Sequence, residues 1–151
     1  MKLLRITAEG LPLFKEKLDL TFYAQQRISE EQKSILYPLF SNIYLNSATG
    51  FIGINASGKT SVLRVILLAL EIINNEPINH IETRDILGDA KEVKLNMYFF
   101  FEKTNEICRL ETIITSQKSK SEGINYSIVS ESLWTKGVDV VTTRKAMLDF
   151  E

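Results

Sequence analysis

The feature that most constrains this chain is a glycine-containing turn, residues 53–60, between a short apolar run and a long apolar segment. We expect residues 48–54 to form a short strand that ends in Phe51-Ile52-Gly53-Ile54. Residues 61–73 carry apolar side chains almost all round the helix axis, which predicts a helix that is buried on most sides. A strand that turns through glycines into a buried helix is typical of an α/β fold.

The turn reads Gly53-Ile54-Asn55-Ala56-Ser57-Gly58-Lys59-Thr60 and fits G-x-x-x-x-G-K-[ST], the Walker A phosphate-binding loop. The two glycines permit a tight curl that turns successive backbone N–H groups inward. The positive N-terminal end of the following helix adds to this anion nest. We expect these eight residues and Ser61 to hold phosphate. Lys59, the catalytic candidate, would contact the β- and γ-phosphates, and the Thr60 hydroxyl would ligate Mg²⁺.

The alternative is a glycine-containing strand-to-helix turn that binds nothing. Four fixed positions alone would recur by chance in roughly one chain in a few hundred. The sequence context favours the phosphate-binding interpretation, because the motif follows a predicted strand and opens a predicted helix.

Alternating apolar residues predict several further strands. Residues 4–8 and 18–22 read as two strands joined by a Gly/Pro turn, which indicates a hairpin or two edge strands. Residues 93–101, 107–115 and 124–129 have short polar connections, which predict an antiparallel meander.

Two short helices are also expected. Ser29 followed by Gln32 is a capping-box pattern, and Pro38 should end the helix that it starts. Residues 142–151 could begin another helix. We expect one domain over residues 1–151, with N-terminal strands, insertion, loop and helix in 1–75 and an antiparallel β-subdomain in 90–141.

Composition narrows the function classes. The 151 residues are 44% hydrophobic and 25% charged, which is close to a soluble globular average. The formal net charge of -1 excludes a whole-chain basic field for nucleic acid. A single cysteine, Cys108, excludes an internal disulfide framework and indicates a reducing compartment. Because no apolar run approaches the length of a membrane span, we expect a soluble, cytoplasmic protein without membrane contact.

With its neighbours, the loop reads F-I-G-I-N-A-S-G-K-T-S, which resembles the ABC-type ATPase heads of the SMC (structural maintenance of chromosomes), RecF and OLD-like AAA ATPase group. The initial strand, the aromatic turn Leu13-Phe14-Lys15, the second strand and the antiparallel β-subdomain are similar to the order of elements in those heads. Glu131-Ser132-Leu133 resembles an E-x-L pattern found after that subdomain.

The sequence also departs from a complete head of this kind. The residues after Thr60 supply no Walker B strand ending in Asp-Glu, no signature motif and no switch histidine. Residues 97–102 are apolar but lack the aspartate. We therefore expect the N-terminal lobe of a larger P-loop ATPase, with weak nucleotide binding and little or no hydrolysis by this chain alone.

The resemblance implies what the complete protein does. It would bind ATP and Mg²⁺ and couple hydrolysis to DNA-related work such as DNA repair, or to antiviral defence against phage. Self-association or a partner would supply the signature motif, and DNA or a nuclease effector would be further partners. The alternatives are a non-catalytic nucleotide-sensing subunit and a P-loop GTPase or small-molecule kinase.

Three other candidates outside the loop have a simpler structural interpretation than a functional one. Asp85-Ile86-Leu87-Gly88 matches the D-x-x-G of GTPases, but an ordinary turn is the better interpretation. Gln117 could be a Mg²⁺-sensing glutamine, although a solvated loop residue is favoured. His80, the only histidine, has no metal-ligand spacing around it, so we expect a loop or packing role.

Three further features of the sequence each have a structural interpretation beside a functional one. Cys108 should pack in the core. Residues 118–121, with Lys118 and Lys120, could touch DNA phosphates but should form a solvated loop. Trp134 is either a partner-facing aromatic residue or a core residue.

Overall fold

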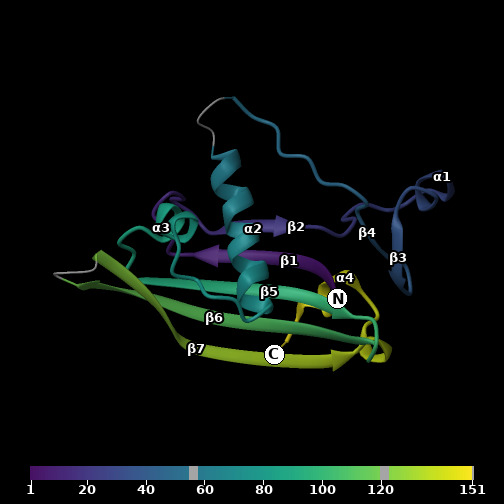
Figure 1. Cartoon of the computed structure of the whole chain (residues 1–151). Helices are drawn as coiled ribbons and strands as arrows, with labels where there is room; N and C mark the ends of the chain where they lie inside the picture. Colours follow the sequence, from purple (N-terminus) through teal and green to yellow (C-terminus); the bar gives the residue numbers. More distant parts are fainter. Residues whose placement is uncertain (55–57, 120–122, 151) are drawn as a thin grey trace.

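The computed structural model describes residues 1–54, 58–119 and 123–150 (Figure 1). Its main element is a five-stranded antiparallel sheet in the order β2-β1-β5-β6-β7. The strands are β1 (Lys2–Glu9), β2 (Leu18–Thr21), β5 (Glu92–Phe101), β6 (Glu106–Ser119) and β7 (Gly123–Gly137).

Two predicted strand arrangements are confirmed. β1 pairs with β2 as a hairpin, with Ile6 opposite Leu20. β5, β6 and β7 form the antiparallel meander, although β6 and β7 extend into the region that was expected to be a loop. β1 also pairs with β5, with Ile6 opposite Met97, so the N-terminal hairpin and the meander share one sheet.

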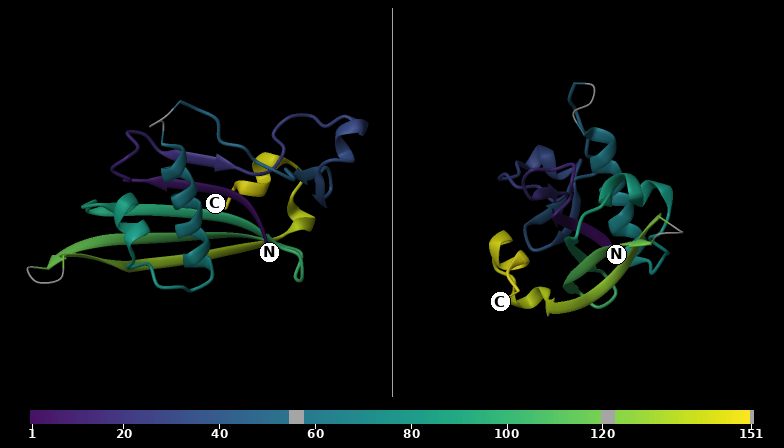
Figure 2. Two further views of the ribbon diagram at one scale, coloured as in Figure 1. Left: turned by 45° about the horizontal axis from the view of Figure 1, so that its top comes forward. Right: turned by 90° about the vertical axis from the view of Figure 1, so that its left-hand side faces the viewer.

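Helix α2 (Lys59–Ile73) crosses one face of this sheet, and its N-terminal end projects beyond β2 (Figures 1 and 2). The inner face of α2 is buried and packs, together with α3 (Ile81–Leu87), against β1 and β5. The buried residues of this face are Val65, Leu68, Ala69 and Ile72. The expectation that the helix is buried on most sides is wrong for this structure. Leu63 and Leu67 on its outer side are 50% and 53% exposed, because only one layer packs against it.

The opposite face of the sheet carries a second core. A bulge in β1 between Leu3 and Arg5 turns Leu4 to this face, whereas Ile6 belongs to the first core. The C-terminal elements, the short 3-10 helix η1 (Val138–Val140) and α4 (Arg144–Leu148), cover part of it. Met147 is fully buried there, and the α4 helix confirms the predicted C-terminal helix.

Between β2 and the loop lies a small insertion made of α1 (Glu30–Lys33), β3 (Tyr37–Phe40) and β4 (Ile43–Leu45). The predicted capping box is present: the Ser29 hydroxyl accepts from the Gln32 N–H, and the Gln32 amide oxygen accepts from the Ser29 N–H. Pro38 lies in β3, after the helix has ended. The insertion is tied to the segment that follows β2, because the Ala24 N–H donates a hydrogen bond to the carbonyl of Tyr44 in β4.

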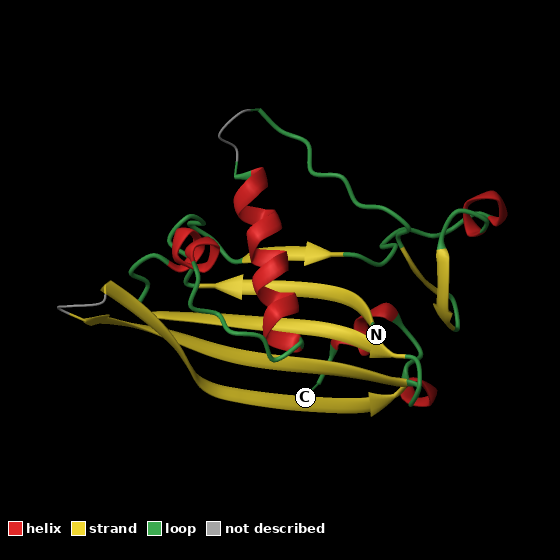
Figure 3. Ribbon diagram, viewed as in Figure 1, coloured by secondary structure: helices red, strands yellow, loops and turns green. Residues whose placement is uncertain are grey.

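The strand expected over residues 48–54 is not formed; Figure 3 draws this segment as loop. Ile52 is fully exposed and Ile54 is 83% exposed. A strand needs a hydrogen-bonded neighbour, and none of the described strands lies beside this segment. The strand expected before the loop is therefore absent from the described residues, whose strand pairings are all antiparallel. The described fold is a mixed α/β arrangement with an antiparallel sheet.

Among the described residues, no helix has the length and apolar character needed to cross a membrane.

The inner and outer faces of α2 predict different losses of folding stability when a leucine side chain is truncated to alanine. Leu68→Ala should lower the free energy of unfolding by about 2–5 kcal/mol, because it leaves a cavity in the first core. Leu67→Ala, the adjacent residue on the outer side, should cost less than about 1 kcal/mol. Urea unfolding monitored by circular dichroism measures both. Equal losses would contradict the described orientation of the helix.

The β1–β2 hairpin carries an ion pair that predicts an acid-sensitive contribution to stability. Arg5 Nε and Nη2 contact the Asp19 carboxylate at 2.8 and 2.5 Å, and this hydrogen bonding lowers the pKa of Asp19. The contribution is present above the unfolded-state pKa of about 3.9 and is lost as pH falls through the lower folded-state pKa. Asp19→Asn should therefore lose less stability than the wild type between pH 7 and pH 2.5 in urea titrations. An identical decline would argue against the pair.

Candidate phosphate-binding site

The start of α2 has the geometry expected of a loop that turns into a helix. Gly58 is the N-cap residue with φ +85°, a left-handed conformation that suits glycine. Its carbonyl accepts the first helical hydrogen bond, from the Val62 N–H at 2.9 Å. Asn55, Ala56 and Ser57 belong to the predicted site but lie outside the described residues. The backbone conformation of Gly58 requires glycine more than a lack of room does, since the Phe14 ring at 3.9 Å is the only contact within 4 Å that an added Cβ would make with the described residues beyond its chain neighbours.

The Lys59 side chain folds back over the beginning of the loop. Its Nζ donates to the carbonyl oxygens of Gly53 and Ile54, both at 2.7 Å. The Lys59 ammonium group thus contacts the first two residues of the motif, whereas the Lys59 backbone belongs to the first turn of the helix. This contact closes the two ends of the loop around one positive charge. The predicted residues Gly53, Ile54, Gly58 and Lys59 are therefore brought together.

A cavity of about 380 Å³ lies beside this ammonium group, lined by Gly50, Phe51, Ile52, Gly53, Lys59 and Val62. None of these lining residues is acidic. Its size falls within the range of about 300–1,000 Å³ typical of small-molecule sites. The cavity therefore offers space for an anion next to a cation.

The N-terminal end of α2 has a partial positive charge that no acidic side chain in its first turn offsets. No acidic residue occupies the first turn, and no side chain of the described residues caps it. The first N–H groups of a helix have no intrahelical acceptor and bear a partial positive charge. Thr60, the predicted Mg²⁺ ligand, is exposed in this turn, and Ser61 is half-buried.

The aromatic turn after β1 contacts the same region. The Phe14 ring lies close to Gly58, at 3.9 Å from the position of an added Cβ, and also packs on the first core. The turn thus supports the loop from the side of the β1–β2 hairpin.

The other sequence candidates lie elsewhere. Asp85 is in α3 and pairs with Arg64 of α2 at 2.7 Å, and Gly88 caps that helix, so the D-x-x-G pattern is part of a helix end. Gln117 is exposed, but in β6 rather than in a loop. His80 begins α3, with ring nitrogens 3.3 and 3.5 Å from carboxylate oxygens of Glu71 and Glu82.

Cys108 is buried, as predicted, and desolvation raises the pKa of its thiol. Lys118 pairs with Asp89 at 3.3 Å, and Lys120 lies outside the described residues. Trp134 is half-buried, with the Arg109 guanidinium 4.7 Å from its ring centroid. It belongs to neither described core cluster.

Within residues 1–54, 58–119 and 123–150, no group of three or more His, Cys, Asp or Glu side chains is placed to hold a metal ion.

Comparisons of this chain with models of protein families, with curated proteins and with solved structures found no match.

Sequence reasoning missed two features of the structure. It did not anticipate that the Gly53 and Ile54 carbonyls would hold Lys59, because backbone acceptors carry no residue-type signal. It also missed a pair of cavities around Tyr23, one of which joins residues distant in sequence, Arg5 and Tyr23 with Arg144.

The left-handed conformation at the loop predicts a position-specific cost of adding a methyl group. Gly58→Ala should lower the free energy of unfolding by about 1–2 kcal/mol, because an L-residue is strained there. Gly50→Ala is the matched control, since its φ is not positive and nothing lies within 4 Å of an added Cβ. Chemical denaturation compares the two. A loss at Gly50 as large as that at Gly58 would contradict the described conformation.

Proposed function

We propose that this chain binds ATP with Mg²⁺ through residues 53–61, as part of a P-loop ATPase of the ABC-like SMC, RecF and OLD-like group. The observation that carries the proposal is the Lys59 ammonium group, held over the Gly53 and Ile54 carbonyls at the end of α2 that no side chain of the described residues caps. The Walker A pattern and its resemblance to those ATPase heads supply the identity of the nucleotide.

In this proposal, each group of the loop acts on one part of the triphosphate. The first backbone N–H groups of α2 donate to phosphate oxygens, and Lys59 neutralises charge on the β- and γ-phosphates. Thr60 is exposed at the helix start, where its hydroxyl could ligate Mg²⁺. When bound, Mg²⁺ would neutralise the charge that builds on the phosphates during attack by water.

We propose that hydrolysis needs groups from additional polypeptide, either elsewhere in a larger protein or from a partner. Support comes from exposed apolar side chains around the loop: Ile52 just before it, Ile54 within it, and Leu63 and Leu67 on the outer side of α2. Segment 48–54 also has no strand neighbour among the described residues. An unpaired segment with exposed isoleucines suits the addition of a neighbouring strand. DNA repair or phage defence follows from the resemblance alone.

A non-catalytic nucleotide-sensing role is the second candidate. It is favoured by the lining of the loop cavity, which contains no carboxylate that could act as a general base. Phosphate release measured with and without a candidate partner separates the two. Release that appears only with the partner supports the ATPase, and no release in either case supports sensing.

The role of Lys59 predicts a loss of nucleotide affinity. Lys59→Ala should weaken binding of ATP with Mg²⁺ at least tenfold, because the variant loses charge-assisted hydrogen bonds to the phosphates. Isothermal titration calorimetry at high protein concentration measures this effect.

Lys103→Ala is the control, since Lys103 is exposed in the turn between β5 and β6 and should not affect affinity. Unchanged affinity in Lys59→Ala would reject the assigned role. A strong preference for GTP in competition would instead favour the GTPase alternative.

A further inference from the structure

A second pair of cavities lies away from the loop, on the side of the sheet covered by α4. The larger cavity, about 740 Å³, lies between β2 and the insertion, and the other, about 640 Å³, lies between β1 and α4. Both are lined by Tyr23 and Gln25, and neither shares a lining residue with the cavity beside Lys59. The two cavities therefore meet at one tyrosine and one carboxamide.

Tyr23 is a buried polar side chain at this junction. Its residue is only 9% exposed, and no hydrogen bond joins its hydroxyl to a described residue. Because no fully buried side-chain oxygen or nitrogen of the described residues lacks a partner, the hydroxyl is open to the cavities that Tyr23 lines. Desolvation raises the pKa of Tyr23, so at neutral pH the hydroxyl remains protonated and can donate. The junction therefore presents an unused hydrogen-bond donor.

The cavity next to α4 has an excess of positive charge. Arg5 is neutralised by Asp19. Arg144 donates only to neutral backbone carbonyls, those of Gln25 and Gln26, and Lys145 forms no ion pair with the described residues. Asp149 is the only carboxylate that the described residues contribute to this lining. One net positive charge remains beside the Tyr23 hydroxyl, which suits an anionic group.

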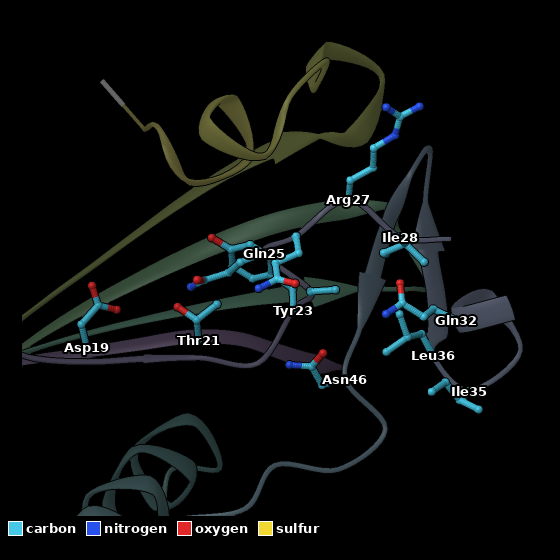
Figure 4. A pocket seen from close by; sticks show the side chains of 12 residues that line it. Asp19, Thr21, Tyr23, Gln25, Arg27, Ile28, Gln32, Ile35, Leu36 and Asn46 are labelled. Atoms are coloured by element: carbon cyan, nitrogen blue, oxygen red, sulfur yellow. The ribbon is translucent and has the colours of Figure 1, made fainter. Parts of the chain in front are cut away.

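The larger cavity has a different character. Figure 4 shows Asp19, Thr21, Tyr23 and Gln25 along the β2 side and Ile28 and Leu36 on the side of the insertion; Arg27 extends away. Gln26, Gln32 and Asn46 add further carboxamides. Amide groups that both donate and accept, next to apolar side chains, suit a heterocyclic base or a similar uncharged polar body.

We propose that the two cavities form one binding site for a nucleoside monophosphate, separate from the Walker A loop. The phosphate lies next to Tyr23, Arg144 and Lys145, and the nucleoside lies between β2 and the insertion. Charge-assisted hydrogen bonds hold the phosphate, and the carboxamides orient the base. The site does not depend on the triphosphate function of the loop, because the two share no residue.

Isothermal titration calorimetry with AMP, adenosine and inorganic phosphate tests this site. We expect AMP to bind at least tenfold more tightly than either fragment, since only AMP occupies both cavities. Tyr23→Phe, which removes the hydroxyl alone, and Lys145→Gln should each weaken AMP binding at least fivefold. Lys91→Gln, an exposed lysine in the turn before β5, is the control. Thermal melts establish that the variants remain folded.

Each result bears on one part of the proposal. Undetectable AMP binding, or AMP affinity unchanged in both Tyr23→Phe and Lys145→Gln, would overturn it. Phosphate binding as tightly as AMP would overturn the assignment of the larger cavity to a nucleoside. Adenosine binding as tightly as AMP would overturn the assignment of the phosphate to Tyr23 and Lys145.

Discussion

The packing of α2 against the antiparallel sheet is the constraint on which the rest of the structure depends. One helix face, with Val65, Leu68 and Ala69 almost fully buried, fixes the helix across β1 and β5. That placement extends the N-terminal end of α2 beyond β2 (Figures 1 and 2). The helix begins there at Lys59, with Gly58 as its N-cap, and both residues are half-buried. The apolar core therefore determines where the charged end of the helix is presented, and the lysine contact with Gly53 and Ile54 shapes the loop around it.

Local signals in the sequence predicted the elements that depend on their own residues. The α2 helix, the Ser29 capping box and the meander follow from periodicity and capping chemistry, and all three are present. Within the loop, the glycine at position 58 was expected to permit a tight curl, and it does adopt a left-handed conformation.

Other features could not be derived, because they depend on which segments become neighbours. Residues 48–54 have the apolar composition of a strand, but pairing decides strand formation, and no described strand lies beside them. The two faces of α2 look alike in sequence, since Leu67 and Leu68 are identical residue types; only the sheet distinguishes them. The Tyr23 cavities depend on the placement of α4 beside β1 and the segment after β2, which lie more than a hundred residues earlier in the chain.

A titration followed by NMR of the ¹⁵N-labelled chain tests the central claim most directly, because it reports the position of even a weak ligand. When ATP and Mg²⁺ are added, the account predicts that the largest shifts occur at the backbone amides of Gly58, Lys59, Thr60 and Ser61. Shifts confined to other parts of the chain, or no shifts at millimolar nucleotide, would contradict the claim that this helix end binds the triphosphate.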